Sequence, residues 1–186
     1  MEAIKKIELS KIAKIILVAM LGTLLLTISA KIKIPFYPVP MTMQTFIVLF
    51  LGITLGPKIG LLTVSLYLFE GIFGLPVFAG TPEKGIGLVY FTGPTMGYLI
   101  GFLVAVYFAG SFKYDKGSIN TFLKLIFSVS FIYILGLIWL GTLIGWNKPI
   151  FKLGAEPFLL AELFKMLLLL FLTPTLLKAK KLIKIT

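Results

Sequence analysis

The chain has 186 residues, of which 59% are hydrophobic and 13% are charged, and its net charge is +11. A soluble domain carries about a quarter charged residues, so this apolar excess is too large for a soluble core and is typical of an integral membrane protein. Cysteine and histidine are absent, which excludes disulfides, thiol nucleophiles and histidine metal sites. The cationic residues are lysines beside apolar segments, so we expect membrane lipid, and no nucleic acid, as a partner.

Six apolar segments approach the length of about 20 residues that a helix needs to cross a bilayer. In chain order they are residues 12–32, 41–56, 58–74, 92–112, 119–145 and 156–177. The first follows several lysines, as in a signal peptide, but no convincing cleavage site follows it, and we expect it to be retained. The pattern predicts an all-α integral membrane protein, a bundle of six transmembrane helices that forms a single domain over residues 1–186.

The lysines predict the orientation of this bundle. Twelve of them lie on the side of both chain ends, five lie on the other side, and Lys165 lies inside a predicted helix. Positively charged residues accumulate on the cytoplasmic side of membrane proteins, so we expect the N-terminus and the C-terminus to be cytoplasmic. The loops after the first, third and fifth helices then face outward.

Two of the outward loops have unusual compositions. Loop one (residues 31–46, KIKIPFYPVPMTMQTF) contains three prolines, which favour a stiff, extended path. Loop three (residues 74–98) is long and rich in glycine, yet it contains apolar residues that a simple connection does not need. We expect loop three to be a lid over a binding site, a plug at the top of the bundle, or both.

Several catalytic motifs are missing from the sequence. There is no GxxxxGK[ST] phosphate-binding loop and no GxSxG nucleophile motif. The residues 85–90 lack the third glycine of a dinucleotide fingerprint. We therefore expect no enzyme activity, no cofactor and no metal site, and any transport driven by ATP requires another chain.

Glu162 and Lys165 are charged residues inside the last apolar segment. Charges near the bilayer centre cost about 2.5–3.5 kcal/mol each on insertion scales, so they indicate a functional site. Their spacing of three residues puts them on one helix face, with Phe158 on the same stripe. Two interpretations remain open: an ion pair that only neutralises itself, or a carboxylate and an ammonium that bind a polar ligand.

Other polar side chains lie near the outward loops. Gln44, Tyr67 and Tyr98 are able to supply neutral hydrogen bonds to a ligand, although tyrosines commonly belong to the interfacial aromatic belt. Glu70 lies near the end of the third apolar segment, where an interfacial or partner-facing role is its first interpretation.

Four segments, PFYPVPMTMQTF, YLFEGIFGLPVFAG, GPTMGYLIGF and PFLLAELFK, follow one another between Ile34 and Lys165. Together, and in this order, they resemble the substrate-binding subunits of biotin transporters, the BioY family. The resemblance implies a multi-pass protein of the cell (plasma) membrane, the S component of an energy-coupling factor transporter. Such a subunit binds biotin for uptake and works with a transmembrane coupling protein and two ATPases.

The resemblance also implies a binding site. The family's acidic and lysine positions fall on Glu162 and Lys165, although the family usually has aspartate in place of the glutamate. Glu162 is expected to accept from the N–H groups of the biotin ureido ring, and Lys165 to bind the tail carboxylate. The candidate substrate-binding residues are Glu162, Lys165, Phe158, Gln44, Thr42, Val39, Phe78, Tyr98 and Thr81.

Alternatives to a biotin-binding subunit remain. The same fold can serve another small vitamin or act as a stand-alone vitamin transporter. An intramembrane enzyme with Glu162 as general base is a third possibility, and a structural subunit without a ligand is a fourth.

Overall fold

The structure is a computed structural model that describes residues 2–34, 37–83, 85–114 and 117–183, with side chains from residue 11 to residue 181 of these ranges. Helices dominate because apolar segments of this length satisfy their backbone polar groups internally. The elements in chain order are α1 Glu2–Lys31, β1 Lys33–Ile34, β2 Met41–Thr42, α2 Gln44–Ile72, α3 Leu88–Phe91, α4 Met96–Ser111, α5 Gly117–Ile144, α6 Ile150–Gly154, a 3-10 turn Glu156–Phe158, and α7 Leu159–Ile183.

Four helical segments of the described chain are long and apolar enough to cross a membrane. They are Lys11–Lys31, Gln44–Ile72, Gly117–Ile144 and Ile150–Lys181, and Met96–Ser111 is a shorter apolar helix. The expected helical membrane class is therefore confirmed at this level. The count of six spans and the orientation of the chain ends stay predictions.

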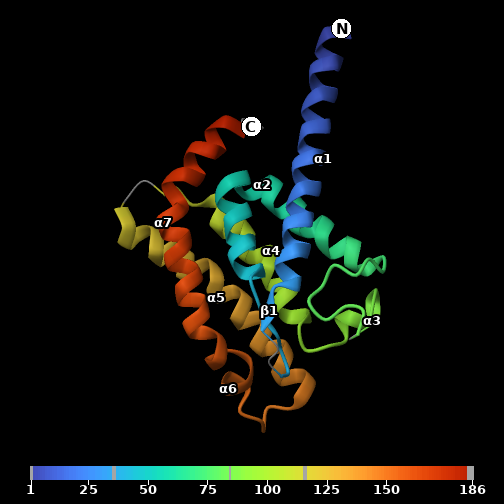
Figure 1. Ribbon diagram of the computed structural model, residues 1–186, viewed down its shortest axis with the longest axis vertical. Coiled ribbons are helices and arrows are strands. Elements are labelled where there is room, and N and C mark those ends of the chain that lie inside the picture. The colour runs from blue at the N-terminus through green and yellow to red at the C-terminus, as the bar shows by residue number, and fades with distance from the viewer. Residues whose placement is uncertain (1, 35–36, 84, 115–116, 184–186) are drawn as a thin grey trace.

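Helix α2 is broken in its middle. Gly56 has φ 78° and ψ 177°, outside the helical region, and Pro57 follows it without a backbone N–H. The helix runs toward the end of the molecule that carries both termini and then turns back (Figure 1). Its two halves correspond to the predicted helices 41–56 and 58–74.

The break packs closely against α4. A Cβ atom on Gly110 would lie 2.6 Å from the carbonyl carbon of Gly56 and 2.8 Å from Cα of Pro57. Glycine at position 110 therefore lets the two backbones approach. Helix α2 also packs against α1 and α7, and α4 packs against α5, so α2 and α4 form the centre of the bundle.

Loop one, loop three and the segment with α6 lie toward the end of the molecule opposite both termini (Figure 1). Loop one contains two short strands that pair as an antiparallel hairpin, which the sequence did not indicate, and its residues 37–39 are bends. In this hairpin Lys33 pairs with Thr42 and Ile34 pairs with Met41. The two strands hold the start of α2 beside the end of α1.

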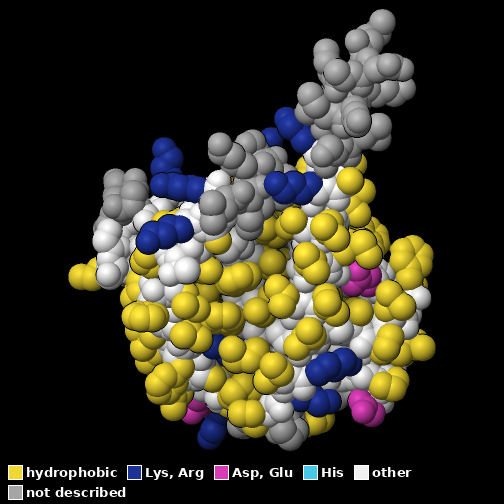
Figure 2. Space-filling view, turned by 45° about the horizontal axis from the view of Figure 1, so that its top comes forward, with side chains coloured by type: hydrophobic (Ala, Val, Ile, Leu, Met, Phe, Trp, Pro, Cys, Tyr) yellow, Lys and Arg dark blue, Asp and Glu magenta, His cyan; other side chains and the backbone are white. Residues whose placement is uncertain are grey.

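The surface has the composition that a membrane environment requires. Figure 2 shows a broad hydrophobic band across this face, with lysines toward its two ends. Large apolar side chains on α1 and α7 are exposed, including Leu17 at 59%, Leu160 at 66% and Phe171 at 80%. In lipid such side chains are in a favourable solvent, which explains their exposure.

Candidate functional site

A cavity with a volume of about 50 Å³ lies between loop one, loop three, α4, α5 and α7. Seven of the nine predicted site residues line it: Val39, Thr42, Gln44, Tyr98, Phe158, Glu162 and Lys165. These positions are distant in sequence, and the packing of α2, α4 and α7 brings them together.

Phe78 and Thr81 are buried but do not line the cavity. The ring of Phe78 stacks on that of Tyr90, which does line it, with centroids 4.7 Å apart. The hydroxyl of Thr81 donates a hydrogen bond to the carbonyl of Phe78 at 2.8 Å. Phe78 therefore packs against a residue that lines the cavity, and Thr81 is hydrogen-bonded to Phe78.

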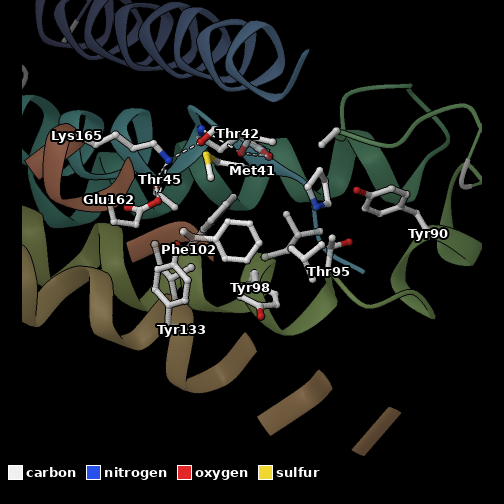
Figure 3. A pocket seen from close by; sticks show the side chains of 17 residues that line it. Met41, Thr42, Thr45, Tyr90, Thr95, Tyr98, Phe102, Tyr133, Glu162 and Lys165 are labelled. Atoms are coloured by element: carbon white, nitrogen blue, oxygen red, sulfur yellow. Dashed lines mark hydrogen bonds and ion pairs between the residues drawn. The ribbon is translucent and has the colours of Figure 1, made fainter. Parts of the chain in front are cut away.

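Glu162 and Lys165 form a buried ion pair at one end of the cavity (Figure 3). The ammonium lies 2.7 Å from Oε1 of Glu162, and the two residues are only 5% and 7% exposed. The spacing of three residues on α7 puts both charges on one face, as the sequence predicts. In the structure each charge neutralises the other, which is one of the two interpretations that the sequence left open.

Thr45 joins the pair and was not predicted. Its hydroxyl accepts a hydrogen bond from Lys165 at 3.0 Å and donates one to Oε1 of Glu162 at 2.8 Å. Lys165 also donates to the carbonyl of Thr42 at 2.6 Å. All three N–H groups of the ammonium thus have acceptors, which stabilises a charge that burial otherwise destabilises.

The middle of the cavity is aromatic and apolar. Phe102 and Tyr98 of α4 lie between its two ends, and Tyr133 of α5 lies beside Glu162 (Figure 3). Tyr98 is held by a hydrogen bond from its hydroxyl to the carbonyl of Gly154 at 2.8 Å. Rings fixed in this way form an apolar wall, which suits the binding of a flat or ring-shaped apolar part of a ligand.

Tyr90 and Thr95 lie at the end of the cavity opposite the ion pair (Figure 3). Burial raises the pKa of Tyr90, while hydrogen bonds with Thr95 and with the backbone of Gly80 oppose that rise. The phenol is therefore protonated at neutral pH and keeps a hydrogen that it is able to donate. The cavity consequently has a charged end and a neutral polar end.

Gln44 connects the cavity to loop three. Its amide nitrogen donates to the hydroxyl of Tyr67 at 2.8 Å, and that hydroxyl donates to the carbonyl of Val77 at 3.0 Å. Tyr67 is fully buried and its ring packs edge-on against Phe78. The hydrogen-bonding capacity predicted for Gln44 and Tyr67 is thus used, at least in part, to hold loop three.

Sequence reasoning missed part of the lining. The additional lining residues are Pro40, Met41, Thr45, Ala79, Tyr90, Thr95, Leu99, Phe102, Ile132 and Tyr133. Thr45 lies in the first turn of α2, and nothing in the local sequence connects it with Glu162 and Lys165 of α7. Ile132 and Tyr133 lie in the middle of a uniformly apolar helix, which offers no local signal either.

A larger cavity of about 400 Å³ lies on the other side of β2. It is mostly apolar and is bordered by α7 and by the β1–β2 hairpin with its flanking residues. Met41, Thr42 and Lys165 line both cavities. The wall between the two cavities therefore includes β2 and the Lys165 side chain.

The fold and the site together define a helical membrane protein with an internal cavity that is charged at one end and aromatic along its length. The chain belongs to the BioY family, which matches residues 3–182.

Named relatives and a solved structure agree with this membership. A Pyrococcus horikoshii protein named "Probable biotin transporter BioY" is 36% identical over 153 residues, covering 82% of this chain and 90% of the relative. The "Biotin transporter BioY" of Thermotoga maritima is 36% identical over 145 residues, covering 77% and 84%. A crystal structure of "the S-component for biotin from an ECF-type ABC transporter" superposes with a TM-score of 0.75 at 26% identity, covering 91% of this chain and 93% of that one.

Proposed function

We propose that this chain is the biotin-binding S component of a biotin-uptake system in the cell membrane. The observation that carries this proposal is the buried Glu162–Lys165 pair facing a cavity in a member of the BioY family. A transmembrane coupling protein and ATPase subunits are its proposed partners, because the solved relative is an S component of an ECF-type transporter. The chain binds the vitamin without changing it chemically.

The geometry supports a specific orientation of biotin. The two charged groups are 2.7 Å apart, so together they face a single polar group. The ureido ring presents N–H donors beside a carbonyl acceptor, which suits a carboxylate beside an ammonium. We therefore assign both charges to the ureido ring and revise the expectation that Lys165 binds the distant carboxylate.

The other parts of biotin then follow the length of the cavity. The apolar thiophane ring lies against Phe102 and Tyr98, and the tail points toward the end formed by Tyr90 and Thr95. A protonated phenol and a threonine hydroxyl are suitable donors for a carboxylate. Pockets for small molecules commonly measure roughly 300–1,000 Å³, so a cavity of about 50 Å³ has to widen to admit biotin. Loop one and loop three are the parts of the wall that lie outside the helix bundle, and we assign the widening to them.

Binding of biotin is the direct test. Purified protein is expected to bind biotin in about one-to-one ratio by titration, and mass spectrometry of the released molecule should show unchanged biotin. Release of a different vitamin would redirect the assignment to that vitamin, and release of a chemically altered product would support an enzyme. A protein that binds none of these would be a structural subunit.

A multi-pass topology with both termini in the cytoplasm is also proposed, on the twelve-to-five lysine distribution. The chain contains no cysteine, so single cysteines report on their own positions. A membrane-impermeant maleimide should label Lys148→Cys in intact cells and Lys178→Cys only after permeabilisation. Both positions are exposed in the structure. The reverse labelling pattern would invert the proposed topology.

A further inference from the structure

Two lysines of loop one bind the backbone of loop three. The ammonium of Lys31, the last residue of α1, donates to the carbonyl of Phe78 at 2.9 Å. It also donates to the carbonyl and the hydroxyl of Thr81 at 3.2 Å and 3.1 Å. Lys33 of β1 donates to the carbonyl of Ala79 at 3.0 Å. Between them, these lysines contact three carbonyls of the segment 78–81.

The segment 78–81 forms part of the cavity wall. Ala79 lines the cavity, and Phe78 stacks on Tyr90, which lines it too. The segment is a turn, with the amide of Thr81 donating to the carbonyl of Phe78 at 3.3 Å. The buried ring of Phe78 anchors the start of this turn against Tyr67 and Tyr90, and the two ammonium groups bind the carbonyls that follow along the turn as well as that of Phe78.

Lys33 belongs to the hairpin that reaches the ion pair, and Lys31 ends the helix that leads into this hairpin. Lys33 pairs with Thr42 in the β1–β2 ladder, and the carbonyl of Thr42 accepts from Lys165. A continuous series of contacts thus runs from the buried pair through both strands to Ala79. Loop one and loop three are tied together at this point.

We propose that Lys31 and Lys33 are positioning residues of the binding site, which hold loop three on loop one so that the two loops open and close over biotin as one unit. This inference rests on the proposed function. Lysines near helix ends commonly serve only as topology determinants. A lysine of that kind has no need of three loop acceptors within 3.2 Å.

Kinetics of biotin binding by the full chain test the proposal. Lys31→Met is expected to raise the dissociation rate constant about fivefold, which corresponds to the loss of roughly one net hydrogen bond. The association rate constant should not fall, because a loosened loop also admits biotin. Lys31→Arg keeps the donors and should restore slow release. A variant that only folds less well would lower the fraction of binding-competent protein and leave the rate constants of the rest unchanged.

Lys148→Met is the matched control. Lys148 is an exposed lysine in the turn before α6, and the described residues show no side-chain hydrogen bond for it. Its replacement should leave biotin release unchanged. Equal dissociation rates for wild type, Lys31→Met and the control would overturn the inference while the proposed function stood.

Hydrogen exchange provides a readout that needs no biotin. In unliganded protein, amides of residues 78–81 should exchange faster in Lys31→Met and in Lys33→Met than in wild type or Lys148→Met. If wild type bound no biotin, the proposed function would fail, yet faster exchange would still support the link between the loops. Unchanged exchange in both variants would show that the lysines do not hold the turn.

Discussion

Replacing Lys165 by methionine is expected to weaken biotin binding about 30-fold to several thousandfold, a loss of about 2–5 kcal/mol. The change removes the partner of the Glu162 carboxylate, which is only 5% exposed. It also removes the ammonium that we assign to the ureido carbonyl, which on binding takes the place of one of the three protein acceptors of Lys165. Glu162→Gln should cause a loss of similar size, because it leaves the ammonium of Lys165 without its counter-charge. Isothermal titration with biotin measures both effects.

A double variant separates binding from stability. Each single change strands a buried charge and should lower the melting temperature, whereas Glu162→Gln combined with Lys165→Met removes both charges. The double variant should regain much of the thermal stability but still bind biotin weakly. If it bound biotin as wild type does, the pair would be purely structural.

Altered ligands identify the part of biotin that the pair binds. In iminobiotin a guanidine replaces the ureido group and becomes cationic on protonation. Relative to biotin, cationic iminobiotin should bind more tightly to Lys165→Met than to wild type. The remaining Glu162 carboxylate attracts the cation, and no ammonium repels it. Esterifying the biotin tail should weaken wild type and Lys165→Met equally. If the loss of affinity caused by the ester disappeared in Lys165→Met, Lys165 would instead be the residue that binds the tail carboxylate.

Removing the Thr45 hydroxyl should produce the second large effect. Thr45 is 8% exposed, and its hydroxyl accepts from Lys165 and donates to Glu162. Thr45→Val keeps the shape but leaves two buried charged groups each short of one hydrogen bond. Biotin affinity should fall by about 1–3 kcal/mol, and Thr45→Ser should restore most of it.

Thr54 of α2 provides the comparison. It is also buried, at 5% exposure, but its hydroxyl donates to the carbonyl of Phe50 within the same helix at 2.7 Å. Thr54→Val should therefore leave biotin affinity close to that of wild type. Equal losses for Thr45→Val and Thr54→Val would mean that the effect is general to buried threonines and not specific to the ion pair.

The sequence by itself determined the membrane class, the break in α2 and the shared face of Glu162 and Lys165. These are local properties. A long apolar run requires a lipid-facing helix, Gly56-Pro57 interrupts helical geometry, and a spacing of three residues places two side chains together. The four family-like segments added the candidate site, of which seven of nine residues line the cavity.

Only the tertiary structure decided which residues complete the site. Thr45 meets Glu162 across 117 positions of sequence, and Tyr133 reaches the same pair from α5. Such contacts depend on how the helices pack, and an apolar helix such as α5 carries no local pattern that predicts them.

The same reason explains Lys31 and Lys33. In sequence they have the signature of any lysine beside a membrane helix, and the expectation for them was limited to topology. Apart from the Thr81 hydroxyl, their acceptors are backbone carbonyls of a turn 46–50 residues away. Every residue has a carbonyl, so no amino-acid type marks these acceptors, and only the folded arrangement of the two loops brings them to the lysines.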